Sequence, residues 1–154
     1  MKNLRDFKNF SLKEFDSLLI EKLNSWSLPV LRVSLGIVFI WFGALKPFGD
    51  SPANEVITKT IYWFDPDIFI PILGVWEILI GICLLYTPLL RFGLFLLALQ
   101  MPGTFLPLVL RPEICFIDVP FNLTLEGQYI IKNLVLIAAA MVVGGRLAPI
   151  KKQQ

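Results

Sequence analysis

Residues 68–86, IFIPILGVWEILIGICLLY, are the clearest indication in this sequence of its fold class. A helix of about 20 residues crosses the ~30 Å hydrocarbon core of a bilayer, and this stretch is long enough to do so. Glu77 lies at its centre, among residues that are almost all apolar. A carboxyl group is costly in a bilayer unless it faces protein or water, so Glu77 is a candidate functional residue.

The composition of the whole chain agrees with a membrane protein. Of its 154 residues, 56% are hydrophobic and 17% are charged, and the mean hydropathy is +0.71. The chain has no histidine, which excludes haem or zinc ligation by His and imidazole acid–base chemistry. Its two cysteines, Cys83 and Cys115, form no Cys-x-x-Cys motif. The net charge of +2 is small, and we expect neither a metal site nor a nucleic-acid partner.

Four blocks of apolar residues predict four membrane-spanning helices, at residues 30–48, 68–86, 89–110 and 128–143. Pro29 is expected to open the first helix, and Asp65 and Pro66 precede the second. Thr87 and Pro88 predict a tight turn between the second and third. The fold class is therefore predicted to be all-α, an integral membrane four-helix bundle.

The N-terminal residues predict a separate helix that lies on the membrane surface. Ser11 and Glu14 fit a capping box, and apolar residues recur after it at helical spacing: Phe15, Leu18, Leu19, Leu23 and Trp26. We expect an amphipathic interfacial helix within residues 1–28, with docking to a partner as the alternative. The four-helix domain then covers residues 29–147, and residues 148–154 form a tail.

Positive charges predict the orientation of the chain. They precede the first span, lie beside the turn between the second and third spans, and follow the fourth, at Lys2, Arg5, Lys8, Lys13, Lys22, Arg91, Arg146, Lys151 and Lys152. By the positive-inside rule both termini are cytoplasmic. The connections 49–67 and 111–127 then face outward, and Ser51 and Pro52 are expected to start a short helix that lies along the outer interface.

Polar and small residues share one stripe on each predicted helix. In the second span, Gly74, Glu77 and Gly81 fall on one face, and small residues mark faces that pack against other helices. The other three spans repeat the pattern, with Arg32, Gly36, Gly43 and Lys46 in the first, Gly93, Gln100, Gly103 and Pro107 in the third, and Gln128, Lys132, Ala139 and Val143 in the fourth. We predict that all four stripes face the interior.

These stripes predict a polar site around Glu77. At ~1.5 Å per residue, Glu77 and Gln100 lie at similar depth, about 13 and 15 Å below the outer ends of their helices, so a hydrogen bond between them is expected. Lys132, with Asn133 beside it, could meet Glu77, and Lys46 would complete a funnel that opens outward. Two lysines near one carboxylate suit an anion or a quinone oxygen. The alternative is that these residues only fix the register of the helices.

Three stretches resemble the DoxX-like superfamily of small four-helix bacterial membrane proteins, in particular its YkgB-like branch. They are LRVSLGIVFIWFGALKPF (residues 31–48), LGVWEILIGICLL (73–85) and LTLEGQYIIKNLVLIAA (123–139), and the likeness covers about residues 30–146. The matching positions are Lys46, Glu77, Lys132 and Asn133. The resemblance implies a bundle in the bacterial inner membrane and an association with quinone-linked or stress-protective systems.

Three functions remain open from the sequence. The first is a redox- or stress-associated membrane subunit that binds a small anionic or quinone-like ligand through Glu77, Lys132, Lys46, Gln100 and Asn133. Because no cofactor motif is present, a non-catalytic role is favoured over an independent enzyme, with quinone as the candidate cofactor. The second is an accessory subunit that contacts lipid, other membrane proteins or further copies of itself, with Phe39, Phe42, Phe92 and Phe95 facing lipid. The third is a proton-coupled transporter that uses Glu77 as its protonation switch.

Overall fold

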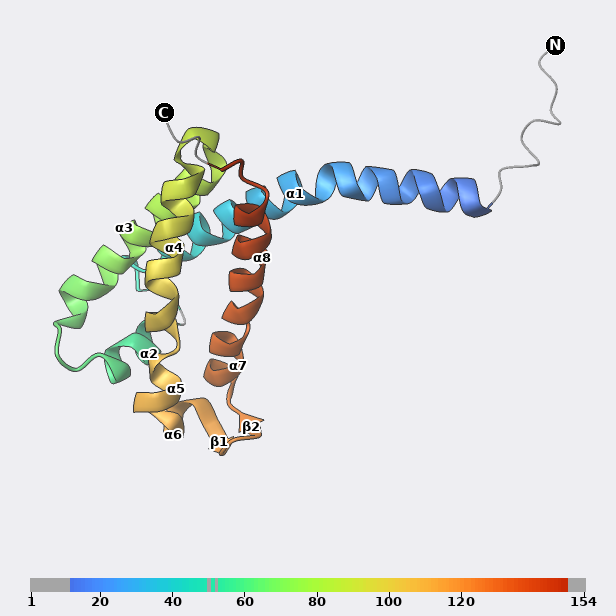
Figure 1. Cartoon of the computed structure of the whole chain (residues 1–154). Coiled ribbons are helices and arrows are strands. Elements are labelled where there is room, and N and C mark those ends of the chain that lie inside the picture. Colours follow the sequence, from blue (N-terminus) through green and yellow to red (C-terminus); the bar gives the residue numbers. More distant parts are fainter. Residues whose placement is uncertain (1–11, 50, 52, 150–154) are drawn as a thin grey trace, which may run out of the picture.

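The computed structural model describes residues 12–49, 51 and 53–149 (Figure 1). Ser11 of the predicted capping box lies outside these residues, as do Lys2, Arg5, Lys8, Lys151 and Lys152. The longest elements are α1 (Leu12–Leu45), α3 (Pro66–Leu85), α4 (Leu90–Thr104) and α8 (Asn133–Gly145). Short elements connect them: α2 (Ala53–Thr60), η2 (Thr87–Leu89), α5 (Leu106–Leu110), α6 (Pro112–Cys115) and α7 (Leu125–Ile131).

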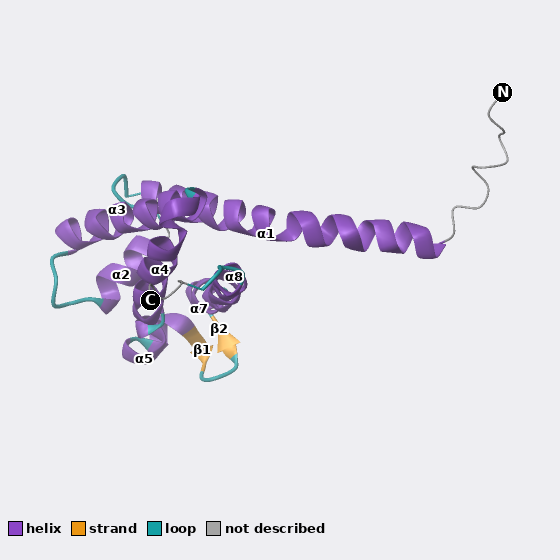
Figure 2. Cartoon of the chain, turned by 45° about the horizontal axis from the view of Figure 1, so that its top comes forward, coloured by secondary structure: helices purple, strands orange, loops and turns teal. Residues whose placement is uncertain are grey.

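The long helices form a four-membered bundle, which confirms the all-α prediction at the level of the architecture. α1 packs on α3, α3 on α4, α4 on α8, and α8 on α1, so the ring of contacts is closed. Figure 2 shows α1 and α3 along one side of the molecule, with α4, α7 and α8 on the other. Among the described residues, four segments are long and apolar enough to cross a membrane, namely Glu14–Leu45, Pro66–Leu85, Thr87–Leu110 and Leu125–Gly145.

The prediction that Pro29 opens a helix is wrong, because α1 runs without interruption through this residue. Proline lacks the N–H that would bond one turn back, yet a single missing bond does not end a helix with long flanks. At ~1.5 Å per residue α1 is about 51 Å long, more than the ~30 Å of a hydrocarbon core. Its N-terminal half therefore projects from the bundle along its own axis (Figure 1).

The other spans agree with the predicted ranges, but the third and the fourth each contain a break. The third span is divided at Phe105 into α4 and α5, and the fourth at Lys132 into α7 and α8. Pro102 and Pro107 flank the first break and remove two N–H donors from the helix. The fourth span also begins earlier than predicted, where the hydroxyl of Thr124 accepts from the N–H of Gly127 and caps α7.

The predicted short helix after Ser51 is present as α2, with Val56 and Thr60 buried on its inner face. Two hydrogen bonds hold α2 across this end of the bundle. Asn54 Nδ2 donates to the carbonyl oxygen of Lys46 at 3.1 Å, and Arg111 Nε donates to the carbonyl oxygen of Lys59 at 2.9 Å. The connection from α6 to α7 contains a two-stranded antiparallel hairpin, β1 (Phe116–Asp118) and β2 (Asn122–Leu123), which the sequence analysis did not predict.

Candidate functional site

Paired glycines bring α1 and α3 into direct backbone contact. A Cβ atom added to Gly43 would lie 2.6 Å from the carbonyl oxygen of Gly74, and one added to Gly81 would lie 2.6 Å from that of Gly36. Gly36 and Gly43 are seven residues apart on α1, as are Gly74 and Gly81 on the antiparallel α3. The predicted small-residue stripes of these two helices therefore face one another.

The same seam carries the charged residues of the candidate site. Lys46 follows the last residue of α1 and lies one turn beyond Gly43, whereas Glu77 lies one turn after Gly74 on α3. Lys46 Nζ and Glu77 Oε2 are 2.5 Å apart, and the two residues are 5% and 8% exposed. In such a buried ion pair each charge compensates the other, and removal of one partner leaves an unpaired buried charge at a high cost in free energy.

Gln100 completes the cluster, as predicted. Its Nε2 donates to Glu77 Oε1 at 2.7 Å, so both carboxylate oxygens of Glu77 have a partner. The side-chain oxygen of Gln100, Oε1, is buried and has no hydrogen-bond partner among the described residues. A buried carbonyl oxygen without a donor is costly, so this atom is a place for a ligand hydroxyl or a water molecule.

Lys132 does not form the predicted ion pair with Glu77. Its Nζ lies 3.4 Å from the centre of the Tyr129 ring and 5.2 Å from the centre of the Phe42 ring. A lysine over aromatic faces is held by cation–π attraction, and the side chain of Lys132 is largely exposed. The break between α7 and α8 falls at this residue. Lys46, expected at the mouth of the funnel, is the cation that pairs with Glu77.

A cavity of about 350 Å³ adjoins this cluster. Lys46, Glu77 and Gln100 form one polar part of its wall, and the other polar residues that line it are Thr60, Thr104, Glu126, Tyr129 and Asn133. Most of the remaining wall is apolar and comes from α1, α2, α3, α4 and α7, including Phe39, Phe42, Ile57, Phe69, Leu73 and Ile130. An apolar cavity with a few polar groups at one place is the usual form of a small-molecule site.

Two expectations about this cavity are wrong. Phe39 and Phe42 line the cavity and do not face lipid, and Phe39 is only 5% exposed. The funnel is not open at Lys46, because α2 lies across that end and contributes Val56 and Thr60 to the wall. Sequence analysis missed these wall residues. The signal that could have placed Phe39 and Phe42 in the interior is their position within one turn of Gly43, on the packed side of α1.

The cysteines and Arg32 lie apart from this cluster. Cys83 and Cys115 are both buried, and neither forms a disulfide bond in the structure. Burial raises the pKa of the Cys115 thiol, and the carboxylates of Glu126 and Glu113 raise it further. Arg32, at the other end of the α1–α3 seam, donates to the hydroxyl of Thr87 and to the carbonyl oxygen of Leu85. It thereby binds the C-terminal end of α3.

Comparison with models of known families, with curated proteins and with solved structures gave no match to this chain. In the part of the chain that the structure describes, no group of three or more His, Cys, Asp or Glu residues is placed to hold a metal ion.

Proposed function

We propose that this chain is a multi-pass protein of the bacterial inner membrane, with both termini in the cytoplasm. Four apolar segments of sufficient length support the insertion. Charge supports the orientation, because Arg32, Arg91 and Arg146 lie at the bundle end that carries the α3–α4 turn. The opposite end, with α2 and the hairpin, carries mainly acidic residues: Glu55, Asp65, Asp67, Glu113, Asp118 and Glu126.

Within that membrane, the chain acts as a redox- or stress-associated subunit that binds a quinone-like or small anionic ligand in the Glu77 cavity. The observation that carries this proposal is the buried Lys46–Glu77–Gln100 cluster in a largely apolar cavity, with Gln100 Oε1 left without a donor. Burial of a charged pair in an apolar cavity costs desolvation free energy and adds little to stability. Charged groups at such positions are therefore more often part of a functional site. The resemblance to the DoxX-like superfamily supports the same class of function.

The charge balance of the cavity favours the quinone-like ligand over the anion. Lys46 is matched by Glu77, and Lys132 lies over aromatic rings, so the cluster offers no surplus positive charge. A neutral ring with carbonyl or hydroxyl groups avoids the cost of a buried unpaired charge. The hydroxyl of a reduced quinone would supply the donor that Gln100 Oε1 lacks.

Purification from the native host in a mild detergent tests the proposal, with organic extraction and chromatography of bound quinones. We expect wild-type protein to retain quinone and Gln100→Leu to retain severalfold less, because this substitution removes the free oxygen and leaves the Lys46–Glu77 pair in place. Glu55→Gln is the control, since it changes only an exposed ion pair with Lys59. If wild-type protein and Gln100→Leu retain equal amounts of quinone, the proposed ligand site is wrong, and the cluster only fixes the register of the helices.

A second candidate is an accessory subunit of a larger membrane complex, and the projecting half of α1 favours it. Leu18, Leu19, Leu23 and Trp26 are all exposed there, at 46%, 46%, 58% and 67%. Exposed apolar residues at helical spacing need lipid or another protein to cover them. Deletion of residues 1–27 should abolish co-purification of a partner and leave quinone binding unchanged if this helix is a docking element.

A further inference from the structure

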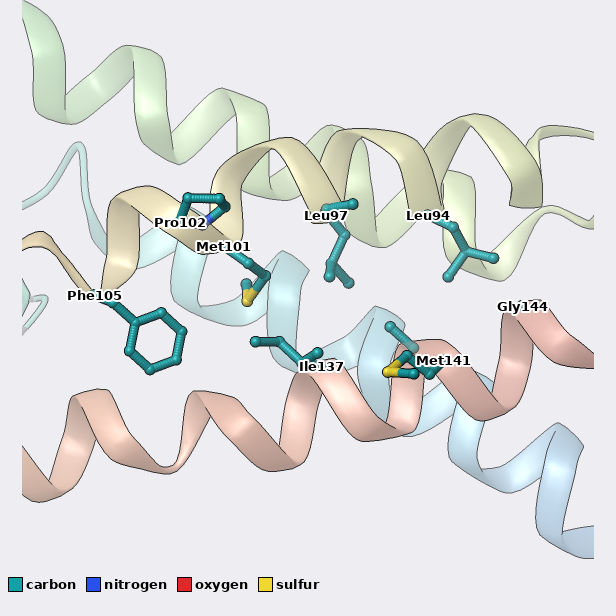
Figure 3. Close-up of a pocket in the computed structure, with 10 residues that line it drawn as sticks. Leu94, Leu97, Met101, Pro102, Phe105, Ile137, Met141 and Gly144 are labelled. Atoms are coloured by element: carbon teal, nitrogen blue, oxygen red, sulfur yellow. The ribbon is translucent and has the colours of Figure 1, made fainter.

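A second hollow lies between α4 and α8 and has a different character from the Glu77 cavity (Figure 3). Its volume is about 450 Å³, and every residue that lines it is apolar. Figure 3 shows Leu94, Leu97 and Met101 on α4 opposite Ile137 and Met141 on α8. We call this hollow the α4–α8 groove.

The groove and the cavity share a wall at the break between α4 and α5. Met101 lines both of them. The next residues alternate, because Pro102 and Phe105 line the groove whereas Gly103 and Thr104 line the cavity. On α8 the same division falls between two adjacent residues, with Leu136 lining the cavity and Ile137 the groove. Met101 thus lies between the two spaces, and rotation of its flexible side chain joins them.

We propose that the two spaces form one site for an amphiphile, with a polar head in the Glu77 cavity and a single apolar chain in the α4–α8 groove. This inference rests on the proposed function and extends it from the head group to the rest of the ligand. The groove offers no polar partner, so it cannot hold the head. The cavity holds the polar cluster but is covered by α2 at its outer end, so a ligand enters from the side.

The head is uncharged, because Lys46, the one cation among the described residues that line the cavity, is already paired with Glu77. This favours a ring with carbonyl or hydroxyl groups over the phosphate of a phospholipid, whose charge would need a free lysine or arginine. Each space has a volume within the ~300–1,000 Å³ range of ligand pockets. The apolar chain of the ligand gains little free energy when it moves from lipid into the groove, because both surroundings are apolar. The groove therefore selects by shape, and it rejects a ligand whose apolar chain does not fit.

Photolabelling tests the site in the full-length protein. The probe is a benzoquinone with a decyl chain that carries a diazirine at its far end, and mass spectrometry identifies the labelled residues. We expect label on the groove residues of α4 and α8, and competition by excess decyl benzoquinone. Label confined to other surfaces of wild-type protein would overturn the inference without any variant. A phospholipid probe of the same design should label the groove weakly.

Two matched substitutions separate the groove from the rest of the surface. Ala98 and Ala138 are both exposed, but only Ala98 lines the groove. Ala98→Trp should reduce labelling about tenfold, which corresponds to about 1.4 kcal/mol, and Ala138→Trp should leave it unchanged. Unchanged labelling in Ala98→Trp, or an equal loss in both variants, would contradict the inference.

The tail-less benzoquinone distinguishes failure of this inference from failure of the proposed function. Its binding is measured by equilibrium dialysis, and Ala98→Trp should not alter it, whereas Gln100→Leu should weaken it. If the tail-less compound binds and depends on Gln100 while the decyl chain labels no groove residue, only the inference about the groove fails. If neither compound binds wild-type protein, both the inference and the proposed function fail.

Discussion

Glu77 shows at the scale of one residue how a costly group is retained inside an apolar bundle. Its two carboxylate oxygens have separate partners, Lys46 and Gln100, which come from the end of α1 and from α4. Each partner replaces part of the hydration that the carboxylate loses on burial. The pair therefore depends on both charges being present.

Removal of one member should be much worse than removal of both. We expect Glu77→Met to destabilise the protein by about 3–5 kcal/mol, because Lys46 is left as a buried unpaired charge. The double variant Lys46→Met with Glu77→Met should recover most of this loss. Unfolding in detergent, followed by circular dichroism, measures both variants, and a single variant as stable as the double one would disprove the coupling.

The Cys115 thiol should react slowly with maleimides. Its side chain is fully buried, and burial together with Glu126 and Glu113 raises its pKa, so the reactive thiolate is rarer at every pH below that pKa. In Cys83→Ser protein, the labelling rate should rise with pH, and the rise should continue to higher pH than for an exposed thiol. Val119→Cys in a background without the native cysteines provides that exposed thiol. Equal rates at neutral pH would show that Cys115 is accessible.

At the scale of elements, the contact between α1 and α3 depends on the absence of side chains. Gly36 and Gly43 meet Gly81 and Gly74 so closely that backbone atoms of one helix occupy the space of a side chain on the other. In a bilayer, helices gain little from hydrophobic burial against one another, so close packing of this kind stabilises the pair. It also sets the register that places Lys46 beside Glu77.

A side chain in this seam should separate the helices. We expect Gly74→Val to cost about 1–3 kcal/mol, since its Cβ alone would lie 2.7 Å from the carbonyl oxygen of Gly43. The displacement should also weaken the Lys46–Glu77 pair and reduce bound quinone. Gly145→Val is the control, because nothing lies within 4 Å of a Cβ added there. Equal unfolding temperatures for the two variants would contradict the close packing.

At the scale of the whole molecule, the two ends of the bundle differ in charge, and this predicts how the chain lies in a membrane. Arg32, Arg91 and Arg146 lie at the end with the α3–α4 turn. The end with α2 and the hairpin carries Lys59 and Arg111 but a larger number of acidic residues. Loops rich in lysine and arginine remain in the cytoplasm.

Cysteine labelling in intact cells tests this orientation. With both native cysteines replaced by serine, Ile117→Cys in the hairpin should react with a membrane-impermeant maleimide added outside. Ala148→Cys, which is exposed at the other end, should react only after the cells are opened. The reverse pattern would invert the proposed topology, and reaction of both sites in intact cells would contradict the membrane assignment.

Residue spacing was sufficient to predict the four apolar segments, the facing glycine stripes of α1 and α3, and the Glu77–Gln100 bond. The predicted stripe of the fourth span is only partly correct, because Gln128 and Lys132 are exposed. The segments and the stripes follow from local periodicity, because spacing alone sets which residues share a helical face. The Glu77–Gln100 bond follows from the similar depth of the two residues in helices joined by a tight turn. Only contacts between distant segments set which cation meets Glu77, because the glycine seam brings the end of α1 beside the middle of α3. The same kind of contact sets the cover formed by α2 and the groove beside the cavity. Both arise where helices from different parts of the chain meet, and no spacing within one helix encodes the shape of the space between two.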